Sequence, residues 1–154
     1  KDRKSEDGPV PDKYEVQELD SPDYLKRTEA NVVDSDATLV FTYGAPKGGS
    51  LRTIEFAQKH GKPWHHVDLE RTRRKKAVDE IVDWLQGGSP VELEIGEDVV
   101  PPESGVLNVA GARESKAPGI RDAVMKRMVD VISAVNGKLF YPIRDPTPPM
   151  ILRE

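Results

Sequence analysis

The sequence predicts a three-layer α/β fold, in which helices cover both faces of a parallel β-sheet. Short apolar runs rich in β-branched residues alternate with longer segments whose apolar residues recur at helical spacing. The short runs contain few polar positions, which is typical of parallel strands that are buried on both faces. A chain of 154 residues is also long enough to form one domain with its own hydrophobic core.

A helix and a strand open the predicted fold. Ser21 and Pro22 fit the N-cap and the first position of a helix that continues to about Asp34. The apolar residues of this segment, Tyr24 among them, are predicted to share one helical face. Residues 37–43, ATLVFTY, form a continuous apolar and β-branched run. This run is the clearest strand of the sequence.

The same alternation continues along the chain. A helix is predicted to begin at Ser50 and to end at Gly61, which can adopt the left-handed conformation of a C-terminal cap. The elements that follow are a strand over 63–69, a helix over 72–86, a strand over 106–110 and a helix over 118–135. Strands joined by helical crossovers run parallel, so we expect a Rossmann-like architecture.

The Rossmann-like domain is expected to span residues 1–136. An insertion over 87–105, rich in glycine, proline and acidic residues, interrupts it, and the proline-rich segment 137–154 is predicted to form an extended C-terminal arm. The chain begins in a polar stretch at Lys1 rather than at methionine. We therefore expect the natural protein to start before this residue.

The composition argues against several classes of function. The sequence has no cysteine, which excludes disulfides, thiolate metal sites and cysteine nucleophiles, and which fits a reducing cytoplasm. A formal net charge of −4 argues against general nucleic-acid binding. No apolar run has the length of a membrane span. We expect a cytoplasmic protein that binds neither nucleic acid nor membranes.

The loop over 43–50, YGAPKGGS, is the first candidate binding site, because ligands of parallel sheets bind outside the carboxyl ends of the strands. Gly48 and Gly49 allow a ligand to approach the backbone closely, and the next helix offers unpaired N–H groups to an anion. Ser50 adds a hydroxyl group and Lys47 a positive charge. The alternative is a tight turn that uses glycine only for its geometry.

The loop over 108–120 repeats this arrangement of strand, polar loop and helix start. Its candidate ligand-binding residues are Gly111, Arg113, Ser115 and Lys116. Arginine and lysine side chains are suited to phosphate-like oxygens. The alternative is a solvated loop whose charges pair with Glu114. Because both loops lie at the same edge of the sheet, the sequence predicts one shared site for a phosphate or oxyanion group.

No metal site is predicted. His65 and His66 are neighbours in a strand, so their side chains point to opposite faces and cannot bind one ion together. His60 lies at a helix C-terminus, where a positive charge suits the helix dipole. The basic run over 71–76 is interpreted as a solvated helix face that nearby acidic residues balance.

Several segments together resemble the family named "putative molybdenum carrier". These segments are KDRKSEDGPVPDKY, YLKRTEANVVDSDATLVF, GGSLRTIEFAQKHGKPWHHVDL and LNVAGARESKAPGI, and they cover most of residues 1–135 apart from the insertion. The resemblance implies a Rossmann-like fold related to the Lonely Guy phosphoribohydrolases and to the molybdenum cofactor carrier proteins of algae. It also implies molybdenum cofactor or molybdate as the ligand, and a homo-oligomer, either a dimer or a tetramer.

The resemblance to the phosphoribohydrolases extends to two further residues. Arg27 precedes the strand that leads to the double glycine, and Glu55 lies in the helix after it, at places where the family has an arginine and a glutamate. The family's GGxGTxxE motif reads GGSLRTIE here and lacks its third glycine. Family members also open with a strand and an SGGQTG-like loop, which this sequence lacks. If the natural protein has this segment, the resemblance implies a third glycine loop that completes the site.

The sequence therefore predicts a binding or carrier protein for a small anionic ligand, with no requirement for catalysis. The alternative is an enzyme, a nucleotide N-glycosidase in which Glu55 assists attack by water and Arg27 holds the phosphate. A third possibility is an interaction subunit whose glycine loops only turn the chain and whose C-terminal arm docks on a partner.

Overall fold

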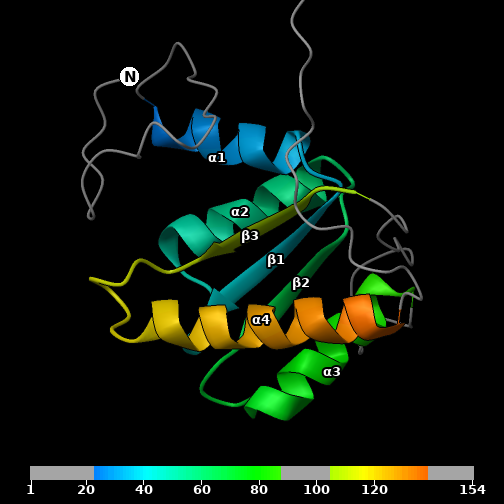
Figure 1. Ribbon diagram of the computed structural model, residues 1–154. Helices are drawn as coiled ribbons and strands as arrows, with labels where there is room; N and C mark the ends of the chain where they lie inside the picture. Colours follow the sequence, from blue (N-terminus) through cyan, green and yellow to red (C-terminus); the bar gives the residue numbers. More distant parts are fainter. Residues whose placement is uncertain (1–22, 88–104, 139–154) are drawn as a thin grey trace, which may run out of the picture.

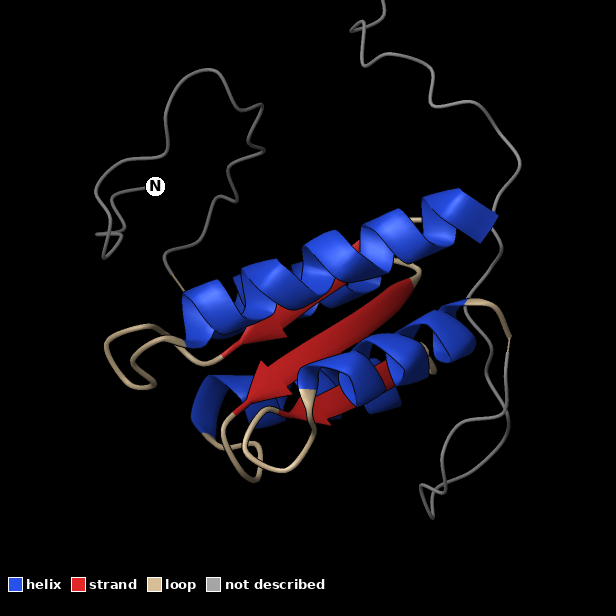
Figure 2. Cartoon of the chain, turned by 60° about the horizontal axis from the view of Figure 1, so that its bottom comes forward, coloured by secondary structure: helices blue, strands red, loops and turns tan. Residues whose placement is uncertain are grey.

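Three parallel strands form the centre of the structure, in the order β2-β1-β3 (Figures 1 and 2). The computed structural model describes residues 23–87 and 105–138, and every structural statement below concerns these residues. The elements are α1 (Tyr24–Val33), β1 (Ala37–Thr42), α2 (Gly48–Lys59), β2 (Trp64–Asp68), α3 (Arg74–Leu85), β3 (Leu107–Gly111) and α4 (Ile120–Lys138). The predicted α/β fold is confirmed.

Strand β1 lies between the other two strands and is buried along its whole length. Its apolar and β-branched residues suit this position, because a central parallel strand has helices on both faces. The register aligns Thr42 with Asp68 and Phe41 with Gly111. The three strands therefore end together, and the loops that follow them meet at one edge of the sheet.

The helices form one layer on each side of the sheet. Helices α1 and α2 pack against each other on one side, and α3 and α4 pack together on the other (Figure 1). Ala37, Leu39 and Phe41 belong to the main apolar core, together with buried residues of α3 and α4. The alternating residues of β1, including Val40, are buried as well, as the pleat of a strand covered on both faces requires.

The topology creates a crevice at the carboxyl ends of the strands. After β1 the chain passes through α2 to β2 on one side, whereas β3 lies on the other side of β1. The helices that follow β1 and β3, namely α2 and α4, lie on opposite faces of the sheet (Figure 1). Ligands of open α/β sheets bind where the strand order reverses in this way.

The first helix differs from its prediction. Asp23 is the N-cap of α1 and its side chain accepts a hydrogen bond from the backbone N–H of Leu25, whereas Ser21 and Pro22 lie outside the described residues. The predicted apolar face is only partly buried, because Tyr24 and Leu25 are 37% and 44% exposed. Tyr24 reaches the carboxyl edge of the sheet instead of the core, with consequences for the candidate site.

Other boundaries agree with the predictions to within a few residues. Helix α2 begins at Gly48, before Ser50, so that Ser50 lies in the first turn of the helix. Most of the predicted insertion and nearly all of the C-terminal arm, residues 88–104 and 139–154, fall outside the described part of the chain. No helix within the described ranges is long and apolar enough to cross a membrane.

Candidate functional site

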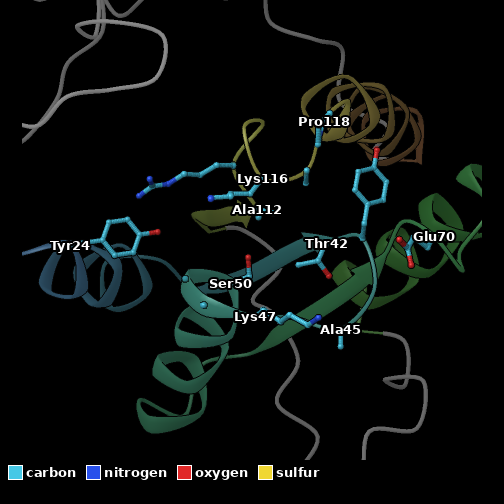
Figure 3. A pocket seen from close by; sticks show the side chains of 15 residues that line it. Tyr24, Thr42, Ala45, Lys47, Ser50, Glu70, Ala112, Lys116 and Pro118 are labelled. Carbon is cyan, nitrogen blue, oxygen red and sulfur yellow. The ribbon is translucent and has the colours of Figure 1, made fainter.

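A cavity of about 720 Å³ opens at the carboxyl ends of the strands (Figure 3). Its volume is in the range of pockets that hold small organic ligands. Both predicted loops contribute to it. The predicted residues that line it are Lys47, Gly48, Gly49, Ser50, Gly111, Arg113 and Lys116. Ser115, the eighth candidate, is not among the lining residues, and the role of all eight in ligand binding stays a prediction.

The N-terminus of α2 faces this cavity without a side-chain cap. Lys47 occupies the N-cap position, and its side chain makes no capping hydrogen bond. Gly48 has φ of 53°, a left-handed conformation that strains any residue with a Cβ atom. The hydroxyl group of Ser50, in the first helical turn, belongs to a side chain that is 5% exposed. The positive end of the α2 dipole is thus open to an anion.

The N-terminus of α4 is already occupied by a carboxylate. Glu114 accepts hydrogen bonds from the backbone N–H groups of Gly119, at 2.5 Å, and Arg121, at 3.0 Å. These two bonds hold the pKa of Glu114 below its usual range. The expectation that both helix N-termini present bare amides is therefore wrong for α4. The physical reason is that the loop turns Glu114 back onto the helix that follows it.

Positive side chains surround the open N-terminus of α2. Lys47 extends from the β1–α2 loop and Lys116 from the β3–α4 loop (Figure 3). Arg113, on the same loop as Lys116, also lines the cavity. The guanidinium carbon of Arg113 lies 5.6 Å from the centre of the Tyr24 ring, within the range of a cation–π contact. Through this contact, the Tyr24 ring helps to hold the positive charge of Arg113 at the mouth of the cavity.

One acidic residue, Glu70, also lines the cavity, on the loop after β2. Its neighbour Asp68 shapes this loop by accepting hydrogen bonds from the backbone N–H groups of Gly44, at 2.8 Å, and of Glu70, at 2.9 Å. Desolvation opposes the ionisation of Asp68, but backbone hydrogen bonds, those from Gly44 and Glu70 among them, outweigh it and lower the pKa. Asp68 is thus a structural anion, and Glu70 is the carboxylate that lines the cavity.

Thr42, which lines the cavity, is hydrogen-bonded to the side chain of His66 on the neighbouring strand β2. The Thr42 hydroxyl group donates to the carbonyl oxygen of Gly44 at 2.5 Å, and its oxygen lies 2.7 Å from Nε2 of His66. Since a hydroxyl group has one proton, His66 must donate from Nε2. Burial lowers the pKa of His66, although the nearby Asp68 acts in the opposite direction.

The two residues implied by the phosphoribohydrolase resemblance do not line the cavity. Arg27 extends from α1 and its guanidinium carbon lies 5.3 Å from the centre of the Tyr24 ring. Its Nε atom is buried and has no hydrogen-bond partner among the described residues. Glu55 forms an ion pair with Arg52 at 2.5 Å on the surface of α2. Neither residue therefore belongs to the cavity lining, although Arg27 contacts the same Tyr24 ring as Arg113.

The histidines are engaged in separate contacts. His65 stacks on Trp84 with 5.4 Å between the ring centres, and His60 lies 2.8 Å from a carboxylate oxygen of Glu29. Across residues 23–87 and 105–138, no three histidine or acidic side chains are grouped closely enough to hold a metal ion. The contacts of His65 and His60 described here are therefore with other side chains of the protein.

Sequence reasoning missed several residues of the cavity. The sequence predicts Tyr24 on an apolar helix face. It places residues 68–71 at the carboxyl end of a strand, where a ligand could bind, but interprets Glu70 in this segment as a partner of the basic run. Thr42, at the end of β1, also lines the cavity and precedes the predicted loop 43–50. The positions of Glu70 and Thr42 in the sequence indicate that they could line a ligand site, because each lies at or just after the carboxyl end of a strand.

Comparisons with known proteins agree with the motifs. No curated protein matches the chain. One solved structure, described as a putative molybdenum carrier protein from Syntrophus aciditrophicus SB, is 38% identical in sequence, with a TM-score of 0.69. The similarity covers 82% of this chain and 72% of the other. The model of the circularly permutated YpsA SLOG family matches residues 1–132. The chain belongs to this family.

Proposed function

We propose that the protein binds and carries a small ligand whose phosphate or oxyanion group sits at the N-terminus of α2. The observation that carries this proposal is the uncapped start of α2, which faces the same cavity as the charges of Lys47, Arg113 and Lys116. Backbone N–H groups of Gly48 and Gly49 would donate to the anion. The side chains would add charge-assisted hydrogen bonds.

The name of the similar solved structure supports molybdenum cofactor or molybdate as the cargo. The residues present fit an oxyanion, because the cavity offers N–H groups and cations near α2. They do not form a site for a bare metal ion, since the sequence contains no cysteine and the described residues contain no metal-binding cluster. The protein would therefore hold such a cargo through its phosphate or oxo groups.

Isothermal titration of the full chain with AMP, pyrophosphate, molybdate and molybdenum cofactor tests the proposal. We expect at least one of the four to bind, and Arg113→Gln to weaken that binding about tenfold at low salt. Arg73→Gln is the matched control, because Arg73 is an exposed cation outside the cavity lining. Absence of binding by all four ligands would refute the proposal.

The glycosidase alternative gains no support from the arrangement of its candidate residues. Glu55 is paired with Arg52 on the surface of α2, and Arg27 contacts Tyr24 outside the cavity lining. We therefore expect Glu55→Gln to leave ligand affinity unchanged. Release of a free base from a nucleoside monophosphate, abolished by this substitution, would instead support the enzyme.

We further propose that the protein forms a homo-oligomer, a dimer or a tetramer. Three apolar side chains of α4, those of Met125, Val129 and Ile132, are each more than half exposed and recur at helical spacing. Light scattering coupled to size-exclusion chromatography measures the molar mass directly. We expect Val129→Glu to lower that mass to the monomer value, and a wild-type monomer would contradict the proposal.

A further inference from the structure

Glu70 introduces a negative charge into a cavity whose other charged lining residues, Lys47, Arg113 and Lys116, are positive. A carboxylate at this position repels a bare oxyanion and competes with it for the same cations. The residue therefore contributes nothing favourable to the binding of molybdate or inorganic phosphate. It becomes useful if the ligand also carries groups that donate hydrogen bonds.

The loops around Glu70 fix the position of its backbone. Asp68 accepts the backbone N–H groups of both Gly44 and Glu70, and so ties the loop after β1 to the loop after β2. A Cβ atom at Gly44 would lie 3.4 Å from Oε2 of Glu70. The carboxylate thus rests against the bare backbone at Gly44, on the wall of the cavity shown in Figure 3.

The acceptor capacity of Glu70 is unused by its surroundings. Within the described ranges, no hydrogen bond or ion pair involves the Glu70 side chain; only its backbone N–H is bonded, to Asp68. An ionised carboxylate has two oxygens that can accept hydrogen bonds from two adjacent donors on one partner. A pair of neighbouring hydroxyl groups has the spacing that such an acceptor needs.

The place of Glu70 in the topology indicates which hydroxyl groups these are. It follows the strand β2 that lies next to β1, about 20 residues after the glycine pair at the start of α2. In mononucleotide-binding βαβ units, the phosphate lies at the helix N-terminus and an acidic residue after the next strand accepts a hydrogen bond from the ribose. In this chain the N-terminus of α2 and the acidic residue Glu70 follow one another in the same order.

We propose that Glu70 binds the vicinal hydroxyl groups of a ribose whose 5′-phosphate sits at the N-terminus of α2. This inference rests on the proposed function, because it requires the anion site at Gly48 and Gly49. It narrows the ligand to a ribonucleotide, and it makes Glu70 the residue that distinguishes an organic phosphate ester from an inorganic oxyanion.

Calorimetric titration of the full chain with three probes tests this inference. The probes are AMP, 2′,3′-dideoxy-AMP, which lacks both hydroxyl groups, and inorganic phosphate. We expect AMP to bind about tenfold tighter than its dideoxy analogue, because two charge-assisted hydrogen bonds are lost with the hydroxyl groups. The affinity for inorganic phosphate should be unchanged or higher in Glu70→Gln.

The variant Glu70→Gln should bind AMP and dideoxy-AMP with nearly equal affinity. The control is Asp83→Asn, which changes the charge by the same amount at an exposed position of α3 outside the cavity; it should keep the wild-type preference. Equal binding of the two nucleotides to the wild-type protein would overturn the role of Glu70 while leaving the anion site intact. Failure of all three probes to bind would instead count against the proposed function itself.

Discussion

The carboxylate of Glu114 accepts the backbone N–H of Gly119 and so takes the place of an anion at the start of α4. At the start of helix α2, on the opposite face of the sheet, the N-cap Lys47 makes no side-chain capping hydrogen bond within residues 23–87 and 105–138. The cavity is therefore asymmetric. One of its two helix N-termini is neutralised by the protein, and the other is open to a ligand.

Removal of this internal anion should affect both α4 and the ligand. In Glu114→Ala, the N–H groups of Gly119 and Arg121 lose their acceptor, so we expect their hydrogen exchange to accelerate. Phosphate should bind more tightly, because a negative charge near the cavity is lost. Hydrogen-exchange mass spectrometry and calorimetry check the two effects. Unchanged exchange at the start of α4 would contradict the capping role.

The same contact predicts a dependence on acid. The pKa of Glu114 is lower in the folded protein than its ordinary value of 4.5. The stabilising effect of this group is therefore complete above the unfolded pKa and is lost as the pH falls through the folded pKa. Protection of the Gly119 amide should decrease over that acidic range, and the Glu114→Ala variant should show no such decrease.

Gly49 should tolerate a methyl group only at the expense of Tyr24. A Cβ atom at Gly49 would lie 2.7 Å from the Tyr24 hydroxyl oxygen, but 3.4 Å from the nearest ring carbon. Gly49→Ala should therefore displace Tyr24 and weaken phosphate binding, by about tenfold if one backbone donor is lost. The fold should remain, because the clash involves the end of a side chain.

The hydroxyl group of Tyr24 provides the matched test. In the double variant Gly49→Ala with Tyr24→Phe, the closest atom is gone and the remaining ring contacts are ordinary. We expect this variant to bind phosphate more tightly than Gly49→Ala alone, by calorimetry. Additive effects of the two substitutions would show that the clash does not control the site.

Gly111→Ala should destabilise the protein rather than merely alter binding. A Cβ atom at Gly111 would lie 2.7 Å from the backbone carbonyl oxygen of Phe41 in the central strand. This contact cannot be relieved by a side-chain rotation, so we expect a loss of about 1–3 kcal/mol in the free energy of unfolding. Urea denaturation followed by circular dichroism measures it. An unchanged midpoint would contradict the close approach of β3 to β1.

His65 should make the fold sensitive to mildly acidic conditions. Burial lowers the pKa of His65 below 6.5, although the charge of Glu80 opposes this effect. His65 in the unfolded chain then binds a proton more readily than in the folded protein. The contribution of His65 to the free energy of unfolding is therefore fully present above pH 6.5 and is lost as the pH falls below that value. Urea midpoints at about pH 7.5 and 5.5 should differ accordingly.

His65→Phe keeps an aromatic ring for stacking on Trp84 and removes the titrating group. It should reduce the difference between the two urea midpoints without abolishing it, because burial lowers the pKa of His66 in the same direction. A midpoint difference as large as that of the wild type would assign the effect to other groups.

The sequence was sufficient to predict the sheet and the place of the cavity. Residues 37–42 are apolar or β-branched at every position, which is typical of a buried parallel strand. Once the strands were known to be parallel, the edge where Gly48 and Arg113 meet followed from the alternation of strands and helices. Local pattern and topology were enough for both conclusions.

Side-chain roles at that edge required the structure. Tyr24 has the spacing of a core residue, and only the path of α1 brings its ring to Arg113 and Gly49. Glu114 looked like a solvated charge, because its capping bonds depend on the turn between two segments. Glu55 matched a family motif but pairs with Arg52 within its own helix. Long-range geometry of this kind is invisible to periodicity.

The contact between Thr42 and His66 limits what Thr42 can do chemically in the cavity. As long as the Thr42 proton is committed to the carbonyl group of Gly44, the imidazole acts as a donor and cannot withdraw that proton. Thr42 is therefore not activated as a nucleophile, in contrast to a hydroxyl group that faces a general base. The cavity therefore presents, at Thr42, a hydroxyl group whose proton is already committed within the protein.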